Sequence, residues 1–333
     1  METFFQGLWM FLQTELTSFA GLTSLSNLIE LMKADDYAWV LTVAGFGATM
    51  GLFFPVMIFL EMMASALKGS FRWKNFKIQI LIYFTNRVIG KVITLQLGFV
   101  LFAFLHQHRF VDTSVTWYWF IYGFLVYDFS HFLHHYMAHR VRLFWCLHST
   151  HHVPPHMNLS VSWAHFYIEN LYADIIRLGI CALAGVELEI MLMVYIIDSV
   201  WGHLIHTSEE ILPDGRLGFL GKFLLTPSHH RVHHSRNPEY IDKNFCNLIP
   251  LYDRLFGTYQ AEIEGEAPIY GVTRDVDTGS LFDVYFGETI DMLNDIKNTP
   301  GIGNKIAYLF MPPGWHPASV LNAEAERQKK AGQ

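Results

Sequence analysis

The chain has 333 residues, of which 52% are hydrophobic, 16% aromatic and only 16% charged. Because soluble globular proteins average about 25% charged residues, this composition predicts a protein that lies largely within a membrane. The net charge of −7 and the lack of a basic patch argue against a nucleic-acid partner. The three cysteines form no CxxC pair, so neither a disulfide framework nor a thiolate metal site is expected.

The N-terminal part of the chain predicts an interfacial region followed by a first membrane span. Residues 1–36 are rich in Phe and Leu but are interrupted by polar residues, which favours an interfacial helix or, equally, a frayed segment. Residues 39–60 carry no charge and are long enough to cross a bilayer as a helix. Basic residues follow between positions 68 and 77, which predicts that this loop is cytoplasmic.

Two further spans are predicted before the histidine-rich part of the chain. The second covers residues 78–105, and the loop at 106–114 then turns on the far side of the membrane. The third begins near Val115 and returns the chain to the cytoplasmic side just before Asp128. We therefore expect residues 37–127 to form the transmembrane helices.

Eight histidines recur at helical spacing in three places. One set is a pair four residues apart, and the other two are triplets at positions i, i+3 and i+4. In a helix, each set would lie on one face. They are His135 and His139; His148, His151 and His152; and His230, His233 and His234. A single pair of this kind is commonly just part of an exposed helix surface, but three sets together predict metal binding. Eight imidazoles exceed what one tetrahedral zinc can use and suit two metal ions, and iron accepts imidazole. No HExxH motif occurs, which disfavours zinc protease chemistry.

The last hydrophobic block, residues 171–201, is divided by charged residues into pieces too short to cross a bilayer. We expect a helical hairpin that enters and leaves from the cytoplasmic face, with a single tilted helix as the alternative. The block ends in WGHLIHT, where His203 and His206 are three residues apart. His206 is predicted as a ninth metal ligand. His203 is predicted as a tenth, although an interfacial histidine bonded to a backbone carbonyl would show the same pattern.

The remaining histidines and the C-terminal tail fit a cap over the metal site. Five histidines with less favourable spacing are interpreted as supporting or surface residues: His131, His134, His156, His165 and His229. Residues 128–260 are expected to form the metal domain, including the hairpin. The extension 261–333 is expected to be cytoplasmic, with one amphipathic helix around 281–296.

These motifs resemble the fatty acid hydroxylase/sterol desaturase superfamily of membrane oxygenases over about Asp128 to Tyr259. The three histidine sets match the boxes HxxxH, HxxHH and HxxHH of that family, and Trp145 and the segments RNPEYIDKNF and DRLFGTY add to the match. Within the superfamily the chain is similar to the alkylglycerol monooxygenase-like branch and its bacterial relatives, in PIYGVT and LFMPPGWHPAS among others. His131, Leu133, His156 and His165 depart from the pattern expected there, which puts the substrate in question more than the metal.

The resemblance implies an all-α integral membrane bundle of about four embedded helices or helix pairs, with a histidine-rich cytoplasmic cap. It implies two iron ions that use O2 and two electrons to hydroxylate or desaturate a C–H bond of a lipid. The protein is then expected in a bacterial inner membrane or the endoplasmic reticulum, with the metal site and C-terminus cytoplasmic. No cytochrome b5-like haem motif occurs, so a separate electron-transfer protein or a reduced pterin is the expected donor.

Supporting residues follow from the same reasoning, because the second ring nitrogen of each ligand needs an acceptor. The candidates are Asp128, Asn158, Asp198, Asp242, Asn244 and Asp253. A lipid must also reach the metals through an apolar passage, unless the same residues simply pack the core. The candidates for that passage are Phe132, Tyr136, Leu159, Val161, Trp163 and Phe166.

Two other functions compete with the oxygenase. A zinc-dependent membrane hydrolase needs a general base and an open water site, which a shell of imidazoles does not offer in an obvious way. A metal-binding membrane protein without catalysis, such as a transporter, needs polar groups at mid-membrane depth, and the first predicted span has none.

Overall fold

The computed structural model describes the backbone of residues 43–322, and the side chains of residues 53–86 and 101–322. The predicted interfacial region 1–36 and the end of the tail, 323–333, lie outside the described residues. The described residues form α-helices and short 3-10 helices, with a single isolated bridge between Ser235 and Tyr270 and no strand, so the all-α class is confirmed.

The chain divides into two compact units, with the boundary between Phe71 and Arg72. The described part of the first unit is one helix, α3 (Val43–Leu67), which overlaps the first predicted span and carries Pro55 inside it. Its mean hydropathy is high, because the helix is rich in Phe, Leu and Met and has no charged residue before Glu61.

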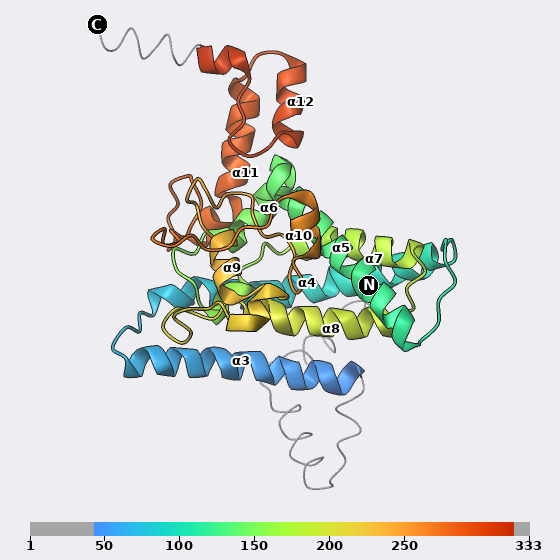
Figure 1. Ribbon diagram of the computed structural model, residues 1–333. Helices are drawn as coiled ribbons and strands as arrows, with labels where there is room; N and C mark the ends of the chain where they lie inside the picture. Colours follow the sequence, from blue (N-terminus) through green and yellow to red (C-terminus); the bar gives the residue numbers. More distant parts are fainter. Residues whose placement is uncertain (1–42, 323–333) are drawn as a thin grey trace, which may run out of the picture. The chain divides into compact units, whose positions relative to one another are not determined.

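Four helices of the second unit form its apolar layer: α4 (Lys74–His106), α5 (Trp117–Arg140), α7 (Glu169–Leu183) and α8 (Leu188–Leu204). α4 packs on α7, and α5 packs on both α7 and α8 (Figure 1). The apolar block at 171–201 therefore forms two helices with a turn between them rather than one continuous helix. A cluster that includes Tyr127, Cys181 and Ile190 fills the space between α5, α7 and α8.

The turn between α7 and α8 is fixed by Gly185, whose φ is +74°. A Cβ atom at this position would lie 1.8 Å from the carbonyl oxygen of Val111, so the loop after α4 can cross here only over a glycine. The loop is held by Phe110 N–H, which donates to Leu183 O at 2.8 Å, and by the Thr113 hydroxyl, which donates to Gly185 O at 2.6 Å.

The rest of the described second unit consists of seven further elements. They are α6 (Arg142–His152), η2 (Leu159–Trp163), η3 (Gly218–Lys222), α9 (Pro227–His233), α10 (Leu251–Phe256), α11 (Leu281–Asn298) and α12 (Ile302–Phe310). The predicted amphipathic helix at 281–296 is confirmed as α11. α11 and α12 lie side by side against α6 (Figure 1).

Arg142, at the start of α6, connects this C-terminal pair of helices to the histidine-bearing helices. Its side chain is only 5% exposed, and Nη1 lies 2.7 Å from an oxygen of Asp295. Its guanidinium also stands over the Tyr308 ring, 5.4 Å from the centroid, and its backbone N–H donates to Met311 O. A buried guanidinium needs such partners, and here α11 and α12 supply them.

Within the described residues, no helix is both long enough and apolar enough to cross a bilayer. α7 and α8 have 15 and 17 residues, and the apolar start of α5 gives way to the histidines of its second half. The predicted bilayer spans are therefore not confirmed.

Candidate metal centre

The first histidine pair lies at the C-terminal end of α5, and a single extended residue turns the chain back along it. Val141 has φ −123° and ψ 113°, so α5 ends at Arg140 and α6 begins at once in a new direction. α6 packs on α5. This places the second histidine set, at the end of α6, opposite His135 and His139.

The third set is on α9, a helix of seven residues whose start is closely specified. Pro227 occupies the first turn, and Thr226 and His229 form a reciprocal capping box in which each side chain bonds the other's backbone. The helix directs His230, His233 and the C-cap residue His234 towards α6. His206 joins them from just beyond the end of α8.

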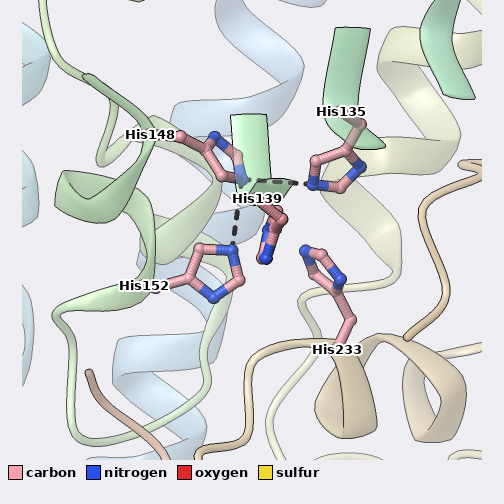
Figure 2. A group of neighbouring side chains, drawn as sticks. All are labelled: His135, His139, His148, His152 and His233. Atoms are coloured by element: carbon pink, nitrogen blue, oxygen red, sulfur yellow. Dashed lines mark hydrogen bonds between the residues drawn. The ribbon is translucent and has the colours of Figure 1, made fainter. Parts of the chain in front are cut away.

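Nine of the ten predicted ligands come together in two groups. The five-histidine group is His135, His139, His148, His152 and His233, and the four-histidine group is His151, His206, His230 and His234. All nine are buried, and within each group the nearest ring nitrogens lie within 4.8 Å of one another. Figure 2 shows the five rings of the first group facing a common centre. The two groups are neighbours, because the rings of His152 and His234 stack 4.4 Å apart.

His203, the tenth predicted ligand, is in neither group. Its Nδ1 donates to Ser199 O at 2.7 Å on the preceding turn of α8, and its side chain is half-buried. This is the backbone-bonded arrangement that the sequence left open as the alternative.

Backbone carbonyls fix the ring protons of three ligands. Nδ1 of His135 lies 2.9 Å from Phe245 O, that of His206 lies 2.6 Å from Gly202 O, and that of His233 lies 2.8 Å from Lys243 O. A carbonyl oxygen can only accept, so each Nδ1 carries the proton and each Nε2 presents its lone pair to the group.

The Nε2 atoms approach too closely for groups with nothing between them. His135 Nε2 is 3.1 Å from His148 Nε2, which in turn is 3.2 Å from His152 Nε2 (dashed in Figure 2). His206 Nε2 is 2.9 Å from His230 Nε2. Where both rings carry the proton on Nδ1, two lone pairs face each other at this distance and repel unless a cation lies between them. Two neighbouring ligands of one ion, each about 2.1 Å from it, are about 3.0 to 3.4 Å apart, so both groups fit an ion.

Two further observations support this fit. His139 Nε2 and His233 Nε2 are buried and have no hydrogen-bond partner, which is unfavourable for a ring nitrogen unless it binds a metal. Burial also lowers the pKa of the imidazoles: that of His139 to about 4, that of His206 to about 3, and that of His135 well below its usual range. These rings are neutral near pH 7, as metal ligands must be. The two groups can therefore hold metal.

A residue that the sequence reasoning missed lies directly behind the centre. Glu169, the first residue of α7, is 3% exposed, and its Oε1 is 2.5 Å from His148 Nδ1 while Oε2 is 2.9 Å from His165 Nδ1. Burial raises the pKa of this carboxyl, but the charges of His165 and His148 and the hydrogen bonds from both rings lower it overall. Its pattern, an acid beginning a hydrophobic helix, resembles an ordinary helix start, so no sequence signal set it apart.

Of the six predicted acidic and amide partners, only Asp242 faces the ring of a predicted ligand. Its Oδ1 lies 3.6 Å from His139 Nδ1, and its other oxygen accepts from Arg140 at 2.6 Å. Asp128 is buried with one oxygen unpartnered, and burial, with the charges of Asp198 and Asp253, raises the pKa of its carboxyl to about 8.

The other four supporting candidates bond elsewhere. Asp198 binds His131 and Asn247, and Asp253 accepts from the backbone N–H groups of Phe245 and Cys246. Asn158 caps η2 through Ser160, and Asn244 donates to His229 O and Gln260 O. These four side chains bond backbone groups and neighbouring side chains instead of the rings of the predicted ligands.

The residues predicted to line a lipid passage fall in different apolar clusters. Phe132 and Tyr136 pack with Leu225 and Phe245, whereas Phe166 packs with Ile78 and Ile82. Trp163 stacks on Tyr83 with ring centroids 4.0 Å apart. Leu159 and Val161 are buried on η2. The passage therefore stays a prediction.

Residues 120–258, which contain both histidine groups, match the family model described as fatty acid hydroxylase. The predicted resemblance to the fatty acid hydroxylase family is confirmed. The match covers nearly all of α5 and continues through α10, and it leaves α3, α4, α11 and α12 outside it.

Curated relatives carry related names. Alkylglycerol monooxygenase of Homo sapiens is 35% identical over 208 residues, which cover 62% of this chain and 44% of that protein. The Xenopus tropicalis enzyme of the same name is 34% identical over 60% of this chain and 43% of its own length. Ornithine lipid hydroxylase OlsE of Rhizobium tropici is 23% identical over 53% of this chain and 52% of that protein. The match thus spans about half or less of each of these relatives. No solved structure matches the chain.

Proposed function

We propose that this protein is a membrane-bound oxygenase that hydroxylates, or desaturates, a lipid C–H bond at two iron ions held by the nine histidines. The observation that carries the proposal is the pair of adjacent, buried imidazole groups whose Nε2 atoms face inward. The names of the relatives, lipid monooxygenases and a lipid hydroxylase, support the reaction class.

Iron is the metal we propose, although imidazole also suits zinc, copper and nickel. The choice rests on the resemblance to oxygenases. Neutral imidazoles contribute no negative charge, so metals held by the nine rings would keep their full positive charge. When bound, two iron ions would supply the activation of O2 that breaking an unactivated C–H bond requires.

The overall reaction needs reductant from outside the chain. In a hydroxylation, one atom of O2 enters the C–H bond as hydroxyl, and two electrons and two protons reduce the other atom to water. We propose that a separate electron-transfer protein or a reduced pterin provides the electrons. No residue of the chain is assigned a redox role.

The chain's own residues hold the ligands and exclude water. The carbonyls of Phe245, Gly202 and Lys243 fix three ring protons on Nδ1, so the inward nitrogens are ready to bind metal without rearrangement. Burial of all nine rings keeps bulk water away from the place where a reactive oxidant would otherwise be lost.

We also propose that the apolar helices associate with a bilayer and that the metal domain and C-terminal extension lie on its cytoplasmic side. The support is compositional, since 52% of residues are hydrophobic and basic residues follow the first apolar run. A lipid substrate is then delivered from the membrane, through the passage predicted around Trp163.

A zinc-dependent hydrolase is the second candidate. Its general base would need to reach a metal-bound water, yet the buried carboxylate of Glu169 contacts the outer Nδ1 of His148, on the far side of the ring from the other Nε2 atoms. The position of Glu169 therefore favours the oxygenase.

Lipid profiling tests the proposal. Cells with and without the gene are compared for lipids that gain 16 mass units or lose 2, and the purified protein is assayed with iron, O2 and reductant. Oxidised lipids that require iron support the oxygenase. Lipid cleavage with zinc, and no oxidised product with iron, would support the hydrolase instead.

A further inference from the structure

Glu169 is in contact, directly or through one ring, with both histidine groups. It is 3% exposed and uses both carboxylate oxygens: Oε1 accepts from His148 Nδ1 at 2.5 Å, and Oε2 accepts from His165 Nδ1 at 2.9 Å. A carboxylate accepts only, so both rings carry their protons on Nδ1. His148 then presents a lone pair at Nε2 to the five-histidine group.

His165 extends this connection to the four-histidine group. Its ring stacks on that of His151, with centroids 4.3 Å apart and planes 11° from parallel. His151 Nε2 lies 3.3 Å from His206 Nε2. One carboxylate thus fixes the orientation of a ring in one group by hydrogen bonding and supports a ring in the other through a stacked neighbour.

His148 differs from the ligands held by carbonyls in the charge of its partner. A carboxylate on Nδ1–H makes the imidazole a stronger base at Nε2 than a neutral carbonyl does. His148 is also the ring whose Nε2 is closest to two others, those of His135 and His152. Its orientation therefore affects the whole five-histidine group.

We propose that Glu169 is a positioning residue of the metal centre: it fixes the tautomer and orientation of His148, raises its strength as a ligand, and through His165 aligns His151. The inference rests on the proposed function for the presence of metal in both groups. A purely structural role is the competing account, because an acid in the first turn of α7 also favours the helix dipole.

Two substitutions of Glu169 separate hydrogen bonding from charge. In Glu169→Gln the amide oxygen can still accept from His148 Nδ1–H, while the amide NH2 faces His165, whose ring can place its proton on Nε2. In Glu169→Ala both bonds are lost. We expect iron(II) affinity, measured anaerobically at chelator-buffered free iron, to fall about 10-fold in Glu169→Gln and about 100-fold in Glu169→Ala.

The matched control is Asp283→Asn, which changes another carboxylate in the first turn of a helix, α11. Asp283 accepts from Arg274 at 3.0 Å and belongs to neither histidine group. Its iron affinity is expected to equal that of the wild type. Thermal unfolding of the metal-free proteins completes the control, because a helix-start role alone would lower stability in Glu169→Gln without changing iron affinity.

A third pair of variants tests the link to the four-histidine group. His165→Phe keeps a ring to stack on His151, whereas His165→Ala removes it. We expect the Mössbauer spectrum of the bound iron to be near normal in His165→Phe and one of its iron environments to change in His165→Ala.

The outcomes are distinguishable. Weaker iron binding and an altered Mössbauer spectrum in the Glu169 variants, with metal-free stability no lower than that of Asp283→Asn, support the positioning role. Normal iron affinity and spectra in both Glu169 variants overturn it and leave the proposed function intact. Wild-type protein that binds no iron overturns the proposed function itself.

Discussion

The two histidine groups are adjacent but are supported in different ways. The five-histidine group has two carboxylates behind it, Glu169 at His148 and Asp242 at His139. The four-histidine group has a backbone carbonyl behind His206, and His151 Nδ1 is buried without a hydrogen-bond partner in the described structure. Charged acceptors strengthen an imidazole ligand and fix its orientation. We therefore expect the metal in the five-histidine group to bind more tightly and that in the four-histidine group to exchange first.

The largest effects are expected from ligand deletion in either group. His148→Ala and His151→Ala should each lower lipid oxidation more than about 100-fold, since a metal-dependent reaction loses a ligand that orients the metal. Metal analysis should show that His151→Ala retains the tighter metal and that His148→Ala loses it. Full activity in either variant would refute the ligand assignment.

A nearly equal loss is expected at His206, and the matched control lies one turn earlier. His206→Ala should lose iron from the four-histidine group, because its Nε2 lies 2.9 Å from that of His230. His203→Ala should keep its iron, because His203 bonds Ser199 O and is outside both groups. Bound iron per chain is the measurement, and equal loss in the two variants would contradict the grouping.

An intermediate effect on stability is expected at Arg231, which lies on α9 between ligands of both groups. Its side chain is 2% exposed and donates to the carbonyls of Thr207, Leu212 and Pro213. Arg231→Met leaves these acceptors without a donor and should lower the free energy of unfolding by roughly 3 kcal/mol. Denaturant unfolding of the metal-free protein measures this. An unchanged midpoint would show that the loop at 207–213 does not need the guanidinium.

The smallest effect is expected at Asp242. Its contact with His139 is long, at 3.6 Å, and its carboxylate is 25% exposed, so water can replace it. Asp242→Asn should weaken iron binding only a few-fold, clearly less than Glu169→Ala, when both are titrated under the same chelator-buffered conditions. A larger loss in Asp242→Asn than in Glu169→Ala would reverse the ranking of the two carboxylates.

The sequence predicts which histidines come together because their spacing is local. His148, His151 and His152 share one face of α6, and the helical period alone places them together. The helical period does not predict which group each histidine joins. His151 belongs to the four-histidine group, whereas His148 and His152 belong to the five-histidine group. That division depends on how α5, α6 and α9 cross, which residue spacing does not encode.

Supporting contacts are harder to predict for the same reason. Glu169 reaches His148 across 21 residues, and Phe245 O reaches His135 across 110. Three of the acceptors are backbone carbonyls, which every residue type has, so the sequence cannot identify them. A search restricted to acidic and amide side chains selected Asp198 and Asn244, which bond other groups. The hydrophobic runs in the sequence predict where the apolar helices lie. They do not predict the residue at which each helix ends.

The central claim is that the nine buried histidines hold two metal ions, one in each group. Metal analysis of protein produced with sufficient iron, together with anomalous scattering from its crystals, tests this most directly. The account predicts two iron ions per chain, one among the five rings and one among the four. A single ion shared between the groups, or an ion bound at His203 outside both, would contradict it.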